Sequence, residues 1–412
     1  MNPVESRKGH DLADLVARRS YGRLVAFLAT RSWDLTLAED ALSEAFLAAL
    51  ADWPRNGCPA NPDAWLMTAA KRKMIDAARS RKRDQAAIEA TVNLVTEPDL
   101  PEIPDRRLSL MFACAHPSIE VGIRAPLILQ LVLGLNANEI ASAFLTSPAA
   151  MGKRLVRAKE KIRIAGIPFR IPETKELPER LGAILEAIYA AYSEGWIDPA
   201  GVDPGRRNLT EESIYLSRLV AELLPKEAEA LGLLALLLYS HGRSRSRRFQ
   251  DEYVPLSAQD PNLWDASIIA EAEKTLLRAP SLGSIGRFQL EASIQSAHIF
   301  RRVTGRANQA DICQLYDALF QITQSPVVAL NQILVRAELD GPENALKLLQ
   351  SIVMDSRLRD YQPSWAARAE LLAKANALQE AYQAYEIAIG LEHDPAVRRF
   401  LRKRQKALNS NA

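Results

Sequence analysis

Apolar residues recur three and four positions apart along almost the whole chain, and this spacing places them on one face of an α-helix. A half-buried strand would instead alternate apolar and polar residues, and little such alternation is present. We therefore predict an all-α protein. Prolines interrupt the pattern, because three fall within 97–105 (EPDLPEIPD) and three within 165–181, too many for a helix interior. Pro126 predicts a kink or a later start in the helix that contains it.

The two proline-rich breaks divide the chain into parts. We expect a first helical domain at residues 1–84, a linker at 85–105, a second helical domain at 106–170 and a long helical extension at 171–412. At about 326–390 in the extension, a helix, a turn and a second helix occur twice with a period of roughly 36 residues. Tetratricopeptide repeats have a similar period of about 34, so these helix pairs are predicted to be tetratricopeptide-like.

Several classes of protein are disfavoured by the sequence. Cys58, Cys114 and Cys313 lie far apart without Cys/His spacing, so we expect neither disulfides nor a metal site, and a cytoplasmic location. The longest apolar stretches, 127–135 and 231–239, are shorter than the roughly 20 residues that span a bilayer, so no membrane helix is expected. Scattered histidines, without a phosphate loop or a nucleophile–base pattern, give little support to an enzyme or a cofactor site.

The clearest local signal is residues 135–163, LNANEIASAFLTSPAAMGKRLVRAKEKIR. Asn136 with Glu139 three positions later is typical of a helix start, where each residue caps a backbone N–H of the other. Ser147 followed by Pro148 marks a second helix start, because proline suits the first helical position. The segment is therefore predicted to form a helix, a tight turn and a second helix.

The second of these helices has two different faces at roughly 100° per residue. The apolar side chains on one face are Met151, Leu155, Ala158 and Ile162. The basic side chains on the other face are Lys153, Arg154, Arg157 and Lys161. A helix-turn-helix places such a basic face in the major groove of DNA, where Arg and Lys reach guanine edges and phosphates. An ordinary solvated amphipathic helix would show the same pattern.

Basic residues are concentrated in two short segments, although the net charge of the whole chain is only +2. Residues 71–83 and 151–170 each hold seven Lys or Arg and one acidic residue. In the first segment the charged side chains on one helical stripe are Arg72, Asp76, Arg79 and Arg83. Trp53 and Trp65 lie upstream, and aromatic rings beside a cationic groove suit stacking of single-stranded bases. Each tryptophan taken alone is more often a core residue.

An acidic segment precedes the basic one at residues 36–53, TLAEDALSEAFLAALADW. Thr36 and Glu39 predict a capping box at its start. The side chains on one stripe of this helix are Asp40, Glu44 and Leu47. Acidic and apolar side chains together suit a basic helical partner, although a purely structural amphipathic helix would look the same.

Taken in order, these segments resemble the sigma-70 family of RNA polymerase sigma factors. LAEDALSEAFLAAL resembles region 2.2, which binds the β′ clamp helices of core polymerase, and NPDAWLMTAAKRKMIDAARSRKR resembles regions 2.3 to 2.4, which open and read the minus-10 element. Residues 135–163 resemble region 4, which reads the minus-35 element and meets the β flap. Regions 1.1 and 3 are missing, as in extracytoplasmic-function members.

The extension resembles that of a subgroup with a large tetratricopeptide-type C-terminal part. The resemblance lies in GIPFRIPETKELPERLGAILEAIYAAYSEGW, SPVVALNQILVRAELDGPENAL and AYQAYEIAIGLE. It implies a sigma region 2 bundle, a region 4 helix-turn-helix and a helical extension that takes part in controlling activity through contact with the sigma domains. It implies no bond chemistry and no cofactor.

Site residues follow from the same resemblance. The residues assigned to core polymerase are Asp40, Glu44 and Phe46, with a place in the domain core as the alternative for Phe46. The residues assigned to minus-10 DNA are Trp65, Lys71, Arg72, Lys73, Asp76, Arg79 and Arg83. The residues assigned to minus-35 DNA are Lys153, Arg154, Arg157 and Lys161.

Other interpretations stay open at the level of sequence. A one-component regulator, with a DNA-binding helix-turn-helix and a ligand- or protein-binding extension, would explain 135–163 but not 36–83. The segment 241–253, HGRSRSRRFQDEY, has four arginines between Arg243 and Arg248, which suit nucleic acid, an acidic surface of the sigma domains or a solvated loop. His298, in SIQSAHIF, is predicted to be a packed helix residue rather than a ligand.

Overall fold

The fold is described from a computed structural model. The residues that it describes are 16, 20–81, 103–144, 146–197, 209–250, 252–279, 282–283, 285–352 and 355–408. Arg83 and nearly all of the linker predicted at 85–105 lie outside this set. Within it, the only strands are β1 (Arg248–Phe249) and β2 (Glu252–Tyr253), which pair antiparallel, and helices make up most of the rest. The predicted all-α class is confirmed.

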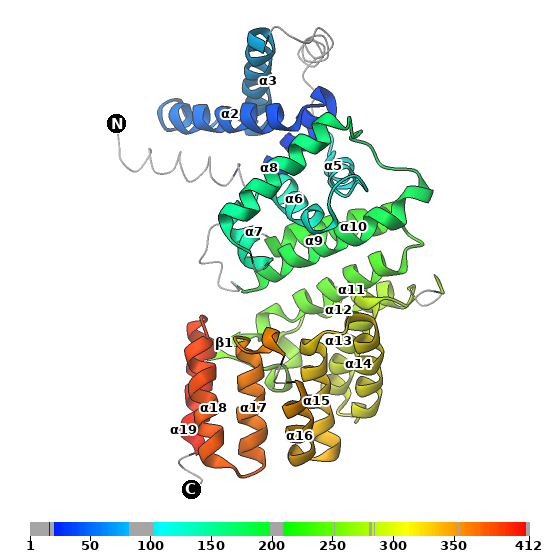
Figure 1. Ribbon diagram of the computed structural model, residues 1–412, viewed down its shortest axis with the longest axis vertical. Helices are drawn as coiled ribbons and strands as arrows, with labels where there is room; N and C mark the ends of the chain where they lie inside the picture. The colour runs from blue at the N-terminus through cyan, green and yellow to red at the C-terminus, as the bar shows by residue number, and fades with distance from the viewer. Residues whose placement is uncertain are drawn as a thin grey trace. The chain divides into compact units, whose positions relative to one another are not determined.

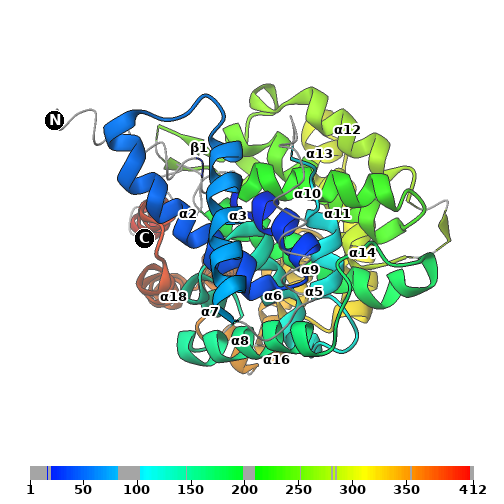
Figure 2. The same ribbon diagram turned by 90° about the horizontal axis from the view of Figure 1, so that it is seen from above.

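The chain divides into two compact units, Met1–Leu219 and Val220–Ala412. In the first unit, residues 20–32 are helical and are followed by α2 (Leu35–Asn56) and α3 (Pro62–Arg81). α2 and α3 cross each other and stay adjacent in both views (Figures 1 and 2).

The start of α2 differs from the sequence-based prediction. Asp34 is the N-cap, and its carboxylate accepts a hydrogen bond from the backbone N–H of Leu37 at 2.9 Å. The capping box predicted from Thr36 and Glu39 is therefore wrong, because the helix has already begun at Leu35 and Glu39 is used in a tertiary contact described below.

A second group of helices follows in the same unit. They are α5 (Arg107–Cys114), α6 (Val121–Leu133), α7 (Ala137–Ala143) and α8 (Pro148–Ile164). α6 begins at Val121 and runs through Pro126, so the helix does not start at the proline. The carbonyl that loses its N–H partner there belongs to Gly122, an exposed residue of the first turn, where water can replace the lost hydrogen bond.

The first unit continues past residue 170, where the sequence predicted a boundary. A 3₁₀ turn (Thr174–Glu176) leads into α9 (Leu177–Ile197), which packs on α5 and α6, and α10 (Leu209–Leu223) follows. The buried Arg124 of α6 donates to the carbonyl of Glu179 at 3.4 Å, and the buried Arg180 of α9 donates to the carbonyl of Phe112 at 3.5 Å. Two buried guanidinium groups thus tie the start of the extension to the preceding helices.

A second link joins the start of α5 to α10. Arg107, which is 7% exposed, forms ion pairs with Asp105 at 2.6 Å and with Glu212. Its guanidinium lies 5.0 Å from the ring centre of Tyr215, whose hydroxyl donates to Asp105 at 3.4 Å. The Arg107 guanidinium holds the pKa of the Asp105 carboxyl below its usual range, against the effect of burial, so the group is charged and paired.

The second unit begins with α11 (Ala228–Gly242), α12 (Ala266–Leu276), α13 (Arg287–Thr304) and α14 (Gln309–Thr323). α11 is buried along almost its whole length and packs on α12 and α13. A Cβ on Gly232 would lie 2.6 Å from the backbone nitrogen of Gln289, so only glycine permits this approach of α11 to α13. Glu229 accepts hydrogen bonds from the backbone N–H groups of Phe288 and Gln289 and thereby caps α13.

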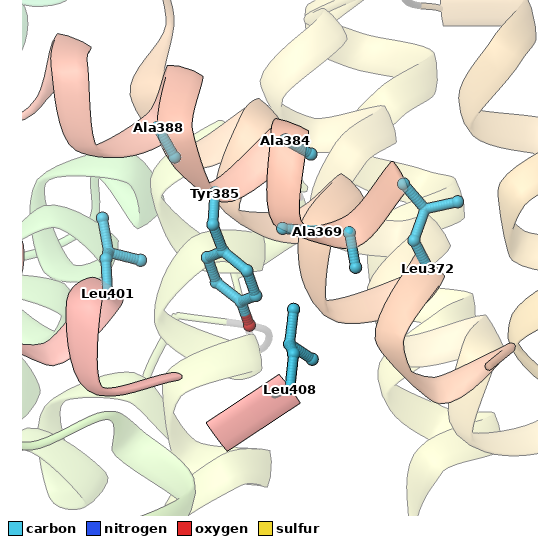
Figure 3. Close-up of a cluster of buried hydrophobic side chains, with 8 residues drawn as sticks. Ala369, Leu372, Ala384, Tyr385, Ala388, Leu401 and Leu408 are labelled. Carbon is cyan, nitrogen blue, oxygen red and sulfur yellow. The ribbon is translucent and has the colours of Figure 1, made fainter. Parts of the chain in front are cut away.

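The remaining helices of this unit are α15 (Pro326–Asp340), α16 (Pro342–Ile352), α17 (Gln362–Lys374), α18 (Leu378–Leu391) and α19 (Pro395–Leu408). The two helix pairs predicted at 326–390 therefore form with nearly the predicted bounds. Ala345 and Ala381, at matching places in the two pairs, are both buried. The last pair packs on α19 around Tyr385, with Leu401 and Leu408 of α19 directed at the cluster (Figure 3). Short 3₁₀ turns lie at Ser244–Ser246, Leu256–Ala258, Pro261–Leu263 and Ser356–Leu358.

Two further observations bear on the sequence-based exclusions. Cys58, Cys114 and Cys313 are all free, and the last two are buried. Within the part of the chain that the structure describes, no helix combines the length and the apolar character needed to span a membrane, and no group of three His, Cys, Asp or Glu side chains is placed to hold a metal.

Candidate nucleic-acid interface

The outward stripe of α2 has the acidic and apolar composition that the sequence predicted. Asp40, Ser43, Glu44 and Leu47 are all exposed, and Leu47 is exposed to 66%. Phe46 is half-buried and its ring stacks on Tyr21, with 6.5 Å between ring centres. The exposed stripe is thus Asp40, Ser43, Glu44 and Leu47, and Phe46 takes part in packing, the alternative that the sequence left open.

The basic residues of α3 do not share one face. Arg72, Lys73 and Asp76 are exposed, whereas Lys71 is only 8% exposed. Consecutive residues point about 100° apart on a helix, so Lys71, Arg72 and Lys73 cannot all face one ligand. Lys71 is thus largely covered in this structure, and its assignment to minus-10 DNA stays a prediction. Nothing is described of the Arg79 side chain.

Trp53 of α2 and Trp65 of α3 pack against each other. Trp53 is 2% exposed and meets Trp65 edge to face, with 5.6 Å between ring centres. Trp65, in the first turn of α3, is half-buried. Trp53 is a core residue, and Trp65 is the less buried of the two.

An ion pair joins the two surfaces. The Lys73 ammonium lies 2.7 Å from the Glu44 carboxylate, and both side chains are about half exposed (48% and 55%). The hydrogen bond and the charge of Glu44 raise the pKa of Lys73. Exposed pairs of this kind contribute little to stability, so either partner is easily transferred to another ligand.

The helix starts predicted for α7 and α8 are confirmed. The backbone N–H of Glu139 donates to the Asn136 side chain at 3.1 Å, and the Glu139 carboxylate accepts from the Asn136 N–H at 2.7 Å. At the next helix, the backbone N–H of Ala150 donates to the Ser147 hydroxyl at 3.3 Å, and Pro148 is the first helical residue. α7 and α8 therefore both begin at residues whose side chains cap the helix.

The two faces of α8 are also as predicted. The buried residues are Met151, Leu155, Ala158 and Ile162. The exposed basic residues are Lys153, Arg157 and Lys161. Arg154 is half-buried and donates to Glu120 at 3.1 Å, so it is partly engaged within the protein. Val156, exposed to 64% beside Arg157, was not predicted; such an apolar group on an exposed basic face suits contact with a thymine methyl group.

Comparison with known proteins bears on these surfaces. Residues 16–84, which hold α2 and α3, match the family model of sigma-70 region 2, and residues 180–280 match a family of unknown function, DUF6596. A protein of Rhizobium meliloti (strain 1021), named only as uncharacterized protein R00370, is 34% identical over 403 residues, covering 95% of this chain and 94% of that protein. The chain belongs to the sigma-70 family. It is a sigma factor with a large C-terminal extension. No solved structure matches it.

Region 2 of this sigma factor is in contact with α8. The Lys159 ammonium lies 2.9 Å from the Glu39 carboxylate of α2, and both side chains are largely buried, at 15% and 12% exposed. Burial raises the pKa of Glu39, and the charge of Lys159 opposes that rise. Burial next to Glu39 also raises the pKa of the Tyr21 hydroxyl. No pattern in the sequence indicates this pair, because its partners are 120 residues apart.

The backbone of region 2 also packs closely on α6. Gly22, in the helical segment 20–32, lies against the carbonyl of Val132 at the end of α6, where a Cβ would be only 1.9 Å from the oxygen. Region 2 and the helices of 106–170 therefore pack within one compact unit of the sigma factor.

The arginine-rich segment of the extension is not a solvated loop. Arg243 is buried and donates to Gln295 at 2.6 Å and to Gln259 at 3.4 Å. Arg248 forms an ion pair with Asp394 between α18 and α19. Arg245 is exposed. The solvated-loop interpretation is wrong for Arg243 and Arg248, which hold the second unit together.

Proposed function

We propose that this sigma factor binds core RNA polymerase through the exposed stripe of α2 and directs promoter-specific initiation with α3 and α8. The observation that carries the proposal is that a region 2 match and two consecutive capped helices, the second with an exposed basic face, occur in one chain. Region 2 explains residues 36–83, which a one-component regulator would leave without a role.

The polymerase contact is proposed for Asp40, Glu44 and Leu47. An exposed leucine flanked by two carboxylates offers apolar area together with charge, which suits the basic clamp helices of the β′ subunit. Because Glu44 is held by Lys73 in a weak surface pair, polymerase binding would release Lys73 toward the minus-10 DNA. The β flap is the second proposed contact on polymerase.

The minus-10 surface is proposed to consist of Trp65, Arg72 and Lys73, with Asp76 between the cations. Exposed cations attract the phosphates of the opened strand, and the half-buried Trp65 ring provides a stacking platform worth about 1–3 kcal/mol per base. The minus-35 surface is proposed to be the outward face of α8, where the Lys153, Arg157 and Lys161 side chains extend into the groove.

Reading both promoter elements at once requires a change from the packing described here. Elements centred near minus 10 and minus 35 lie about 25 base pairs apart, or about 85 Å at roughly 3.4 Å per base pair. The 2.9 Å contact between Lys159 and Glu39 holds α8 against α2 and is incompatible with that span. The proposal therefore includes breakage of this ion pair when the sigma factor binds polymerase and promoter.

The extension is proposed to modulate this step, as expected of an extracytoplasmic-function member with a tetratricopeptide-like part. Support comes from α9 and α10, which pack on α5 and α6 through Arg124, Arg180 and Arg107. A partner that binds α9 or α10 would therefore act on helices that are in direct contact with α5 and α6.

Transcription with purified core polymerase tests the proposal. The double variant Lys153→Gln with Arg157→Gln is expected to lower minus-35-dependent initiation by about tenfold or more, since each good base contact is worth about 1–3 kcal/mol. The matched control is Arg163→Gln with Lys175→Gln, two exposed cations off this face. A folded wild-type chain that never directs promoter-specific initiation would overturn the proposed function.

A further inference from the structure

The last helix, α19 (Pro395–Leu408), carries six Lys or Arg and no acidic residue. Four of these cations point outward and form one stripe, because their spacing of three, one and three residues follows the helical repeat. The stripe consists of Arg399, Arg402, Lys403 and Lys406, all of them exposed. We call it the α19 stripe.

The opposite face of α19 is firmly packed. Leu401 and Leu408 are buried with Tyr385 in the cluster of α17 and α18 (Figure 3). Phe400 meets Tyr253 of β2 edge to face, with 5.5 Å between ring centres. The orientation of the α19 stripe is therefore fixed by the core of the second unit rather than by the stripe itself.

The two other cations of α19 have structural partners. Arg404 forms an ion pair with Glu370 at 2.6 Å, and Arg398 donates to the backbone carbonyl of Glu392 at 3.1 Å. In the α19 stripe, Lys403 has only a long, exposed contact with Glu252 at 3.4 Å, the two side chains being 75% and 58% exposed. Such a pair holds Lys403 weakly.

The α19 stripe brings like charges together on one helix face. Residues 399 and 403, and residues 402 and 406, are like-charged neighbours four positions apart, and such pairs repel each other on a helix. All four side chains are exposed. An external polyanion would remove the repulsion.

We propose that the α19 stripe binds the phosphate backbone of duplex DNA without reading its sequence. This inference rests on the proposed function, which brings the chain to promoter DNA. The stripe rises about 10.5 Å along the helix axis, a length of duplex that carries about six phosphates. Lys and Arg are the side chains that contact phosphates, whereas Gln405, the amide of this helix, donates to the carbonyl of Tyr382 and is occupied.

An anionic membrane fits the stripe less well. A helix that lies in a membrane interface buries an apolar face in the lipid. The apolar face of α19 is instead buried against α17, α18 and β2, so only the basic face is available.

The test is the salt dependence of binding of the full chain to a mixed-sequence duplex, measured by fluorescence anisotropy between 50 and 200 mM salt. The variant replaces all four residues of the α19 stripe by Gln. Each phosphate contact contributes about −0.9 to the slope of log K against log salt, so the variant's slope should be smaller in magnitude by about 3 to 4. Over this range the wild type should then lose on the order of 100-fold more affinity than the variant.

The matched control removes the same charge elsewhere in the second unit. It is the quadruple Gln variant of the exposed residues Lys226, Lys274, Arg306 and Lys347. This control should keep the wild-type slope. Equal slopes for the α19 variant and the wild type would overturn the inference, as would equal losses in both variants, which would indicate a net-charge effect. Unchanged DNA binding with weakened binding to core polymerase would also overturn it and identify a protein surface as the ligand.

Initiation assays separate this inference from the proposed function. If the wild type directs promoter-specific initiation but the α19 variant keeps the wild-type salt slope, the inference fails and the proposed function stands. If the slope falls as expected but the wild type never initiates at a promoter, the proposed function fails and the DNA-binding site stands.

Discussion

A methyl group at Gly22 would disturb the packing of region 2 on α6. Gly22 lies in the helical segment 20–32, and a Cβ there would be 1.9 Å from the carbonyl oxygen of Val132 and 2.7 Å from its carbonyl carbon. Real Cβ atoms essentially never approach another atom closer than 3.0 Å. One of the two backbones must therefore shift by about 1 Å in the variant Gly22→Ala.

The expected loss can be worked from two opposing effects. Overpacking costs about 1–3 kcal/mol. Because a backbone carbonyl cannot rotate aside, the cost of overpacking in Gly22→Ala should be near 3 kcal/mol. Alanine recovers about 1 kcal/mol over glycine in a helix, which leaves a net loss of about 2 kcal/mol. In a unit of about 200 residues this lowers Tm by about 4–8 °C.

Gly152 provides a control with the same substitution. It also lies in a helix, α8, but no atom lies within 4 Å of a Cβ built there. Gly152→Ala should therefore raise Tm by about 1–4 °C. Calorimetry of the full chain measures both variants, and amide exchange in α2 and α6 assigns the transition to the first unit. If Gly22→Ala melts at or above the wild-type temperature, the close packing of Gly22 on α6 does not limit stability and the reasoning is refuted.

Two further predictions concern buried titratable groups. Lys159→Met leaves the Glu39 carboxylate buried without its partner and should lower the free energy of unfolding of the first unit, measured in urea, by about 2–3 kcal/mol. The control Lys161→Met, at an exposed residue, should change that free energy by less than about 0.5 kcal/mol. Equal effects of the two variants would contradict a role for the pair. Burial lowers the pKa of His298 from 6.5 to about 4. Between these two pH values only the unfolded state takes up the proton. The contribution of His298 to stability is therefore present above pH 6.5 and is lost as the pH falls toward 4. His298→Gln should remove up to about 3 kcal/mol of this loss. An NMR titration in which His298 titrates near 6.5 would contradict the assignment.

Local features of the fold were predictable from the sequence. The buried face of α8 and the capping box of Asn136 with Glu139 follow from side chains only a few positions apart, and both formed as predicted. The helix pairs at 326–390 were predictable for the same reason. Their physical causes, helical periodicity and hydrogen bonding of end groups, act within a few turns.

Features that depend on distant partners were not predictable. Glu39 was assigned to a local cap, but it pairs with a lysine 120 residues away. Arg243 looked like part of a solvated loop because nothing in its neighbourhood in sequence indicates that Gln295 accepts its hydrogen bond. Lys71 was grouped with its basic neighbours, although the burial of each helical face depends on what packs there.

The attachment of α9 to α5 and α6 decides how this protein can be shortened. A truncation near residue 170, at the proline-rich break, would remove α9 and leave the apolar surface of α6 in water, an aggregation-prone product. Loss of transcription by such a fragment would report a damaged first unit and nothing about regulation. The turn at 224–227, between α10 and α11, is the place to cut, because the helices that cover α5 and α6 then stay with the fragment.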